Sequence, residues 1–143
     1  MKKVNKLYYF SENNHNGEIM IPHIPSTIVM GEYGDILEME ERETKRVPFS
    51  RTISGAFLSI NFDGRYEELY LHVPENIDDI SYEDIVFPTK EQVWDGDYTK
   101  EVWVTSPVKM KCIGKMLIGY DLSKTTWDDW KPSVKFRWIE KYN

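Results

Sequence analysis

The chain has 143 residues, a length typical of a single domain that can bury a hydrophobic core without metal or disulfide support. Its formal net charge of −6 argues against binding nucleic acid through the phosphates, which needs a basic surface. One cysteine, Cys112, excludes an intramolecular disulfide and a cysteine-rich zinc site. With no signal peptide and no run near the ~18 apolar residues of a membrane span, we expect a cytoplasmic protein without a membrane partner.

The N-terminal third predicts short extended segments joined by turns. Residues 6–10 are expected to form a first strand, and Asn16-Gly17 suits the positive φ angles of a tight hairpin turn. Residues 18–21 form a short strand that ends at Pro22. The charged residues 31–45 are expected to form a loop that could hold one helical turn.

One helix is expected over residues 53–60, because its apolar residues recur at the spacing of a single helical face. Ser50 or Thr52 would provide the N-cap, and residues 46–50 before it are expected to be extended. Later strands are expected at 68–73, 85–87, 101–104, 108–120 and 134–138. Gly114 leaves open whether residues 108–120 form one long strand or a hairpin.

These elements predict an α+β domain covering residues 1–143, with six or seven mainly antiparallel strands and one or two short helices. Residues 122–143 form an aromatic extension that holds three of the five tryptophans. It could complete the sheet, close a cleft or pair with a second subunit, so a homo-oligomer stays open. Within it, alternation of Val134, Phe136 and Trp138 with charged residues predicts a half-buried strand.

Several common catalytic patterns are missing from the sequence. The eight glycines are scattered, so no phosphate-binding glycine loop is expected. We expect no carboxylate–histidine cluster, no serine-hydrolase triad and no metal site. His15 is expected in a solvated turn and His72 in a structural role, whereas His23, between two prolines, is a candidate site residue. Metal-dependent and acyl-transfer enzymes are therefore disfavoured.

A candidate phosphate site lies at the junction between residues 46–50 and the helix. It combines two guanidinium groups and two hydroxyl groups with the unpaired N–H groups of a helix N-terminus. The candidate ligands are Arg46, Ser50, Arg51 and Thr52. The alternative is an ordinary N-cap flanked by exposed arginines.

Three further residues could face a ligand. Glu101, at the start of a strand, could hold ribose hydroxyls or stabilise a developing cation, or it could simply pair with a surface lysine. Tyr9 or Trp103 could stack on a planar base.

Taken in order, these segments resemble a small phage and bacterial protein family that is similar to a minimal ADP-ribosyltransferase-type fold. The resemblance covers about the first 120 residues. It is carried by residues 6–11, Pro22-His23-Ile24-Pro25, residues 46–50, 69–73, 99–104 and 107–114.

The resemblance implies a split, mostly antiparallel sheet whose cleft accepts NAD or an ADP-ribose derivative. Tyr9 stands where related enzymes often have a ribose-anchoring histidine, whereas the late glutamate is kept as Glu101. Loss of the anchor favours binding without turnover, and no cofactor beyond this ligand is required.

The leading expectation is a protein that binds an NAD-derived or ADP-ribose-like nucleotide. If it is phage-encoded, it would act in the host cytoplasm and sequester a host immune signal of the cyclic ADP-ribose type. One alternative is an active ADP-ribosyltransferase or NAD-cleaving enzyme with Glu101 as catalytic carboxylate. Another is an acidic inhibitor of a protein partner that takes no small ligand.

Overall fold

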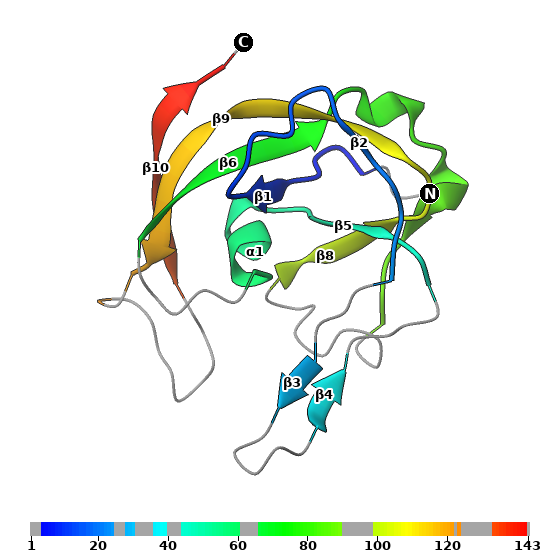
Figure 1. The fold of residues 1–143 in the computed structure, drawn as a ribbon, viewed down its shortest axis with the longest axis horizontal. Helices are drawn as coiled ribbons and strands as arrows, with labels where there is room; N and C mark the ends of the chain where they lie inside the picture. Colours follow the sequence, from blue (N-terminus) through cyan, green and yellow to red (C-terminus); the bar gives the residue numbers. More distant parts are fainter. Residues whose placement is uncertain are drawn as a thin grey trace.

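A computed structural model describes residues 4–24, 28–30, 36–39, 44–60, 66–89, 99–121, 123 and 133–142. Its largest sheet has five strands. Four of them follow the order β1 (Tyr9–Ser11), β6 (Glu67–Pro74), β9 (Val108–Tyr120) and β10 (Val134–Lys141). The fifth strand, β2 (Ile19–Met20), pairs with the start of β9. Figure 1 shows β6 and β9 as long, curved ribbons that arch over the rest of the chain.

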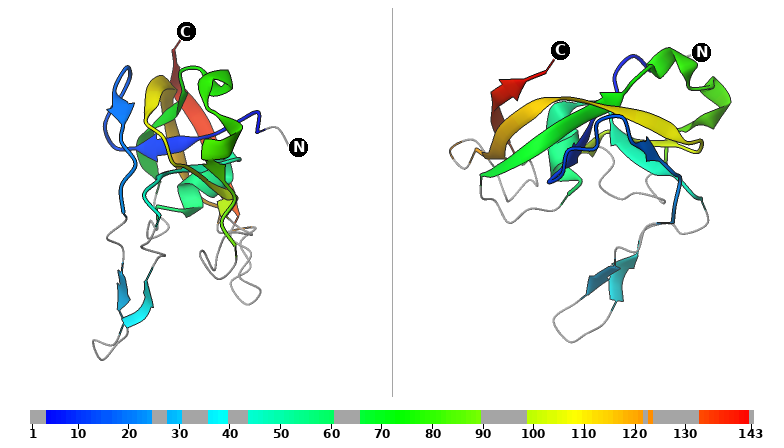
Figure 2. Two further views of the ribbon diagram at one scale, coloured as in Figure 1. Left: turned by 90° about the vertical axis from the view of Figure 1, so that its right-hand side faces the viewer. Right: turned by 45° about the horizontal axis from the view of Figure 1, so that its top comes forward.

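A second sheet of three strands lies under this arch. It has the order β5 (Val47–Ser50), β8 (Glu101–Val104) and β7 (Ile85–Val86). Tyr8, just before β1, joins the two sheets through reciprocal backbone hydrogen bonds with Ser50 at 2.7 and 3.0 Å. A two-stranded hairpin of β3 (Ile28–Met30) and β4 (Ile36–Met39) projects away from both sheets (Figures 1 and 2).

The helix α1 (Ile53–Leu58) follows β5 directly. The Thr52 hydroxyl caps it by accepting the Gly55 N–H at 2.9 Å, which satisfies one donor of the first turn. Ala56 and Phe57 point from the helix into a core formed with β1, β6 and β9. Gly55 lies so close to the Thr99 carbonyl and the Ser50 hydroxyl that no side chain fits there. The helix is thereby held tightly against the second sheet.

The hydrophobic core has two parts. One lies between the second sheet and the first half of β9, and its buried members include Val47, Val102 and Met110. The other surrounds Phe57 under the second half of β9. Both are anchored by alternate residues of one 13-residue strand, as the period-2 pattern of β9 requires.

Most sequence-predicted elements are confirmed with small shifts. The strand at 101–104 is found as predicted, and residues 108–120 form one strand, not a hairpin. Gly114 has a φ of 156°, and a side chain there would collide with Trp138 and the Glu140 carbonyl on β10. Gly114 therefore allows β10 to pack closely, and it does not end the strand. Thr52, and not Ser50, is the N-cap.

Three predictions are wrong. Residues 31–45 are not all loop, because β4 pairs with β3. Gly17 does have a positive φ of 80°, but the turn does not make a hairpin, because β1 pairs with β6 and β2 with β9. The described residues contain ten strands and not six or seven.

The strand β10 confirms the predicted extended segment, but its burial is uneven. Val134 and Trp138 pack against the core around α1, whereas Phe136 between them is 42% exposed. Trp127 and Trp130 lie outside the described residues. The fold class is α+β with mostly antiparallel strands, and every strand pair in the described ranges is antiparallel. In those ranges, no helix is long and apolar enough to cross a membrane.

Candidate functional site

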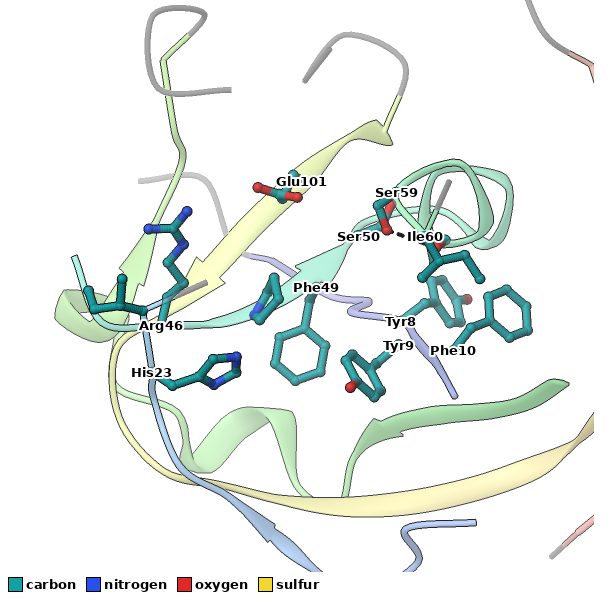
Figure 3. Close-up of a pocket in the computed structure, with 13 residues that line it drawn as sticks. Tyr8, Tyr9, Phe10, His23, Arg46, Phe49, Ser50, Ser59, Ile60 and Glu101 are labelled. Atoms are coloured by element: carbon teal, nitrogen blue, oxygen red, sulfur yellow. Dashed lines mark hydrogen bonds between the residues drawn. The ribbon is translucent and has the colours of Figure 1, made fainter. Parts of the chain in front are cut away.

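A pocket of about 320 Å³ opens where the two sheets meet α1 (Figure 3). Its walls come from β1, β5, α1, β8 and the segment after β2, which are distant in sequence. The lining residues are Tyr8, Tyr9, Phe10, His23, Ile24, Arg46, Pro48, Phe49, Ser50, Ala56, Ser59, Ile60 and Glu101. Aromatic rings, one guanidinium and one carboxylate thus surround the same space.

Arg46 forms the cationic part of the wall and is only 2% exposed. Its guanidinium lies 3.8 Å from the centre of the Trp103 ring, and its Nη1 donates to the Thr44 carbonyl at 3.0 Å. Stacking on an aromatic face stabilises a buried guanidinium. A lysine ammonium would be stabilised less at this position, because it is a compact, strongly hydrated charge. The arginine is therefore held in one orientation at the pocket wall.

Glu101 contacts the indole N–H of the same tryptophan. The Trp103 indole N–H donates to Glu101 Oε2 at 2.7 Å, so one carboxylate oxygen has a fixed partner. Register places Glu101 opposite Ser50 and Trp103 opposite Pro48 on the paired strands β8 and β5. Arg46, Trp103 and Glu101 thus form one connected unit, in which the buried tryptophan positions a cation and an anion at the pocket.

The opposite wall is aromatic. Tyr9 and Phe49 meet edge to face, with ring centres 6.3 Å apart and planes at 65°. Burial raises the pKa of the Tyr9 phenol, so this group stays protonated near neutral pH. Figure 3 shows both rings facing the same space as His23. A planar apolar group could lie along this wall while polar groups reach Arg46 or Glu101.

His23 enters the pocket from the segment after β2. Its backbone pairs with Arg46 through hydrogen bonds of 3.1 and 3.0 Å, so its position is fixed relative to the arginine. Its Nδ1 lies 3.2 Å from the Ile21 carbonyl, which can only accept, so Nδ1 carries the proton. Its Nε2 is then the ring nitrogen left for a contact with a ligand beside Arg46.

The structure brings five of the eight sequence-predicted residues together and places three elsewhere. The pocket is lined by Tyr9, His23, Arg46, Ser50 and Glu101, but not by Arg51, Thr52 or Trp103. The Arg51 guanidinium lies 5.6 Å from the Phe87 ring, and the Thr52 hydroxyl caps α1. Trp103 is fully buried beneath Arg46, so it supports the wall and does not offer a face to a ligand.

Ser50 has a structural role in the pocket wall. Its hydroxyl donates to the Thr99 carbonyl at 2.5 Å and accepts the Thr52 N–H at 3.2 Å. The first bond ties the end of β5 to the segment just before β8, and the second holds the chain between β5 and α1. The predicted phosphate site is thus reduced to Arg46, with His23 as its neighbour in place of Arg51.

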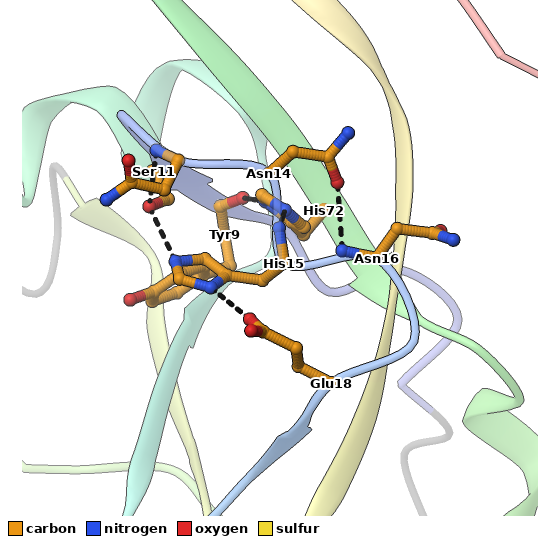
Figure 4. Close-up of polar contacts among 8 residues, drawn as sticks. Tyr9, Ser11, Asn14, His15, Asn16, Glu18 and His72 are labelled. Atoms are coloured by element: carbon orange, nitrogen blue, oxygen red, sulfur yellow. Dashed lines mark hydrogen bonds and ion pairs between the residues drawn. The ribbon is translucent and has the colours of Figure 1, made fainter.

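A second polar cluster, which the sequence-based prediction missed, lies in the turn between β1 and β2 (Figure 4). The Ser11 hydroxyl lies 2.9 Å from His15 Nε2. His15 Nδ1 forms a very short contact with Glu18 Oε2. The expectation that the chain holds no carboxylate–histidine cluster is therefore wrong.

His72 on β6 supports this turn from below. It is fully buried, and its Nε2 accepts the His15 backbone N–H at 2.9 Å. Its Nδ1 therefore carries the proton and faces the Tyr9 carbonyl at 3.3 Å. Burial lowers the pKa of His72, with a smaller contribution from His15, so the ring is neutral near pH 7. The structural role predicted for His72 is confirmed.

The spacing Ser11-x3-His15-x2-Glu18 within a turn was the one signal that could have suggested this cluster. The contact with His72 could not have been found, because 57 residues separate the two histidines. Among the described residues, no three His, Cys, Asp or Glu side chains form a group that could hold a metal ion.

Comparisons with protein-family models, with curated proteins and with solved structures find no significant match to this chain.

Proposed function

We propose that the protein binds an NAD-derived or ADP-ribose-like nucleotide in the pocket between the two sheets, without turning it over. The observation that carries the proposal is the unit of Arg46, Trp103 and Glu101, which presents a fixed cation and a fixed carboxylate to one pocket. A nucleotide needs both, since its phosphates are anionic and its ribose hydroxyls donate hydrogen bonds.

In the proposed complex, the phosphate lies against Arg46, with the His23 ring beside it. The ribose hydroxyls bond Glu101, and the planar base lies along the Tyr9 wall. The volume of about 320 Å³ is at the lower end of small-molecule sites, roughly 300–1,000 Å³. It therefore suits one nucleoside with its phosphate, and the rest of a larger ligand would extend towards solvent.

Binding without turnover is favoured by the fixed hydrogen bond on Glu101. The indole N–H of Trp103 stabilises its carboxylate, but the pocket provides no described second carboxylate and Tyr9 has a protonated phenol where the resemblance implies a histidine. In a phage, such a protein would sequester a nucleotide signal of host defence. The alternative of an active ADP-ribosyltransferase or NAD-cleaving enzyme is favoured by one observation, that Glu101 itself lines the pocket.

The first experiment is mass spectrometry of small molecules released from the denatured protein, followed by calorimetry with ADP-ribose, NAD and cyclic ADP-ribose isomers. We expect saturable heat with at least one of them. Glu101→Gln keeps an acceptor for the Trp103 N–H and should still weaken binding about tenfold or more, because a charged hydrogen bond contributes roughly 1.5–3 kcal/mol.

The matched pair for the phosphate assignment is Arg46→Lys and Arg51→Ala. The first keeps the charge but loses stacking and bidentate bonding, so affinity should fall, whereas the second should leave affinity unchanged because Arg51 lies over Phe87. No released nucleotide and no heat with any of the three ligands would overturn the proposal. Consumption of labelled NAD that Glu101→Gln abolishes would establish the enzyme instead.

A further inference from the structure

The turn between β1 and β2 holds a serine, a histidine and a glutamate in series. We propose that Ser11 is an activated nucleophile, with His15 as its general base and Glu18 orienting that base. The inference is independent of the nucleotide pocket, since none of these three residues lines it.

The hydrogen bonds define the tautomer that the chemistry needs. Glu18 Oε2 contacts His15 Nδ1, and an ionised carboxylate only accepts, so Nδ1 carries the proton. The lone pair of His15 Nε2 therefore faces the Ser11 hydroxyl 2.9 Å away. This is the same sequence of roles as in a serine hydrolase, where nucleophile and base lie within hydrogen-bond reach and a third group orients the base.

The main chain around the base is held in place. The His15 N–H donates to buried His72 at 2.9 Å, and the Asn16 side chain accepts the Cys112 N–H of β9 at 2.9 Å. Gly17 and Glu18 add backbone hydrogen bonds to Met110 at 2.7 and 2.8 Å. A turn tied to β6 on one side and to β9 on the other keeps the base aligned without help from a substrate.

The nucleophile is accessible from solvent. The side chains of His15 and Glu18 are 25% and 58% exposed, and Ser11 is half-buried at the end of β1. The Asn13 N–H donates to the Ser11 oxygen at 3.1 Å and would stabilise negative charge as the hydroxyl loses its proton. Because Glu18 is partly solvated, its electrostatic effect is weaker than that of a buried carboxylate. The site suits small activated esters.

The proposed reaction is the hydrolysis of such an ester. Ser11 Oγ attacks the carbonyl carbon while its proton moves to His15 Nε2. The bond from carbon to the leaving oxygen then breaks, and His15 returns the proton to that oxygen, which leaves an acyl-serine and a free alcohol. Water attacks the acyl-serine with His15 again as base, so that one ester and one water give one carboxylic acid and one alcohol.

The test is covalent labelling of the folded full chain with a fluorophosphonate, together with hydrolysis of p-nitrophenyl acetate. We expect one adduct, located on Ser11 by peptide mass spectrometry. Ser11→Ala should abolish it, and His15→Gln should slow it by about 10² or more, as loss of a general base typically does. The control is Ser123→Ala, because the Ser123 hydroxyl bonds the Asp121 carboxylate at 2.6 Å without a histidine between them.

The role of Glu18 as a positioning residue is tested by rescue. Glu18→Gln should slow labelling, and Glu18→Asp, which restores a carboxylate, should recover part of the rate at unchanged thermal stability. Two results would overturn the proposal. One is that Ser11 is labelled no faster than Ser123. The other is that His15→Gln leaves the labelling rate unchanged while circular dichroism shows that the variant is folded. Equal rates in the two Glu18 variants would remove Glu18 from it.

Discussion

The pocket and the turn cluster place similar polar groups in two very different settings. Arg46 and Glu101 in the pocket are separated by 55 residues and are positioned by paired strands and a fully buried tryptophan. Ser11, His15 and Glu18 lie within eight residues and are positioned by one turn. The pocket geometry is thus a property of the core, whereas the cluster geometry depends on a few hydrogen bonds to neighbouring strands.

The pocket and the turn cluster are both in contact with Tyr9. Its ring lines the pocket, and its carbonyl oxygen faces His72, which supports the turn. Tyr9 and His72 are also in edge-to-face contact, with ring centres 6.1 Å apart. Substitutions that disturb one setting and spare the other therefore show how far the two sites are independent.

The substitution expected to affect the pocket most, while sparing the turn cluster, is Gly55→Ala. The added methyl group would collide with the Thr99 carbonyl and the Ser50 hydroxyl, so α1 must move away from the second sheet. We expect a loss of about 3 kcal/mol in the free energy of unfolding, at the upper end of overpacking effects. Nucleotide affinity should fall while Ser11 labelling is unchanged below the unfolding transition. Urea unfolding and calorimetry measure both quantities.

The matched control is Ser54→Ala, which changes a helix residue outside the pocket lining. Ser54 is half-buried, and the change to alanine leaves no cavity larger than one hydroxyl group, so its effect on stability should be within about 0.5 kcal/mol. If Gly55→Ala were as stable as this control, the tight contact between α1 and the second sheet would be contradicted.

The opposite result, an effect on the turn cluster that spares the pocket, is expected from Asn16→Ala. It removes the acceptor for the Cys112 N–H on β9, and leaving that donor unpaired should cost about 1 kcal/mol. The turn loses one anchor, so labelling of Ser11 should slow several-fold while nucleotide affinity stays the same. Asn16→Asp keeps the oxygen acceptor and should retain more of the stability. Equal losses in the two variants would show that this hydrogen bond does not hold the turn.

The smallest effect concerns the dependence of stability on pH. The pKa of His72 is lowered in the folded state, mainly by burial, so the unfolded chain binds a proton first as pH falls below about 6.5. The stability from neutral His72 is present above that pH and is lost as pH falls towards the folded pKa. Thermal unfolding should therefore occur at lower temperature at pH 5 than at pH 7.5.

His72→Gln should reduce this pH dependence, because glutamine can still accept the His15 N–H but does not titrate. His15, Glu18 and the Tyr9 phenol lie around His72 and remain in the variant, so the comparison isolates the loss of the His72 ring. An identical pH dependence in the variant and the unchanged protein would exclude His72 as its source.

The sequence was sufficient where a local pattern determines the structure. The helical spacing of Ile53, Ala56 and Phe57 predicts α1, and the apolar run at residues 101–104 predicts β8. It was insufficient for β4, because residues 31–45 are rich in charged side chains and contain two glycines, a composition that is typical of a loop. Alternation in β10 also overstated burial, because Phe136 faces solvent although its neighbours on that face pack.

The candidate site shows the same limit. The proximity of Arg46 and Glu101 follows from strand register, which no local pattern contains, and only the family resemblance suggested it. Arg51 and Thr52 were attractive because they neighbour Arg46 in sequence, yet they turn to Phe87 and to the helix N-terminus. The turn cluster was missed for the opposite reason, because three polar residues in a turn usually only bond solvent.

The strand β9 pairs with β2, β6 and β10, so most of the large sheet depends on one late segment of the chain. During synthesis, the first hundred residues therefore emerge without the strand against which their apolar faces pack. Such non-local pairing makes folding slow, with times of about milliseconds to seconds. Until β9 leaves the ribosome, the segments that later form the pocket and the turn are expected to expose apolar surface, which makes the nascent chain a natural client for chaperones.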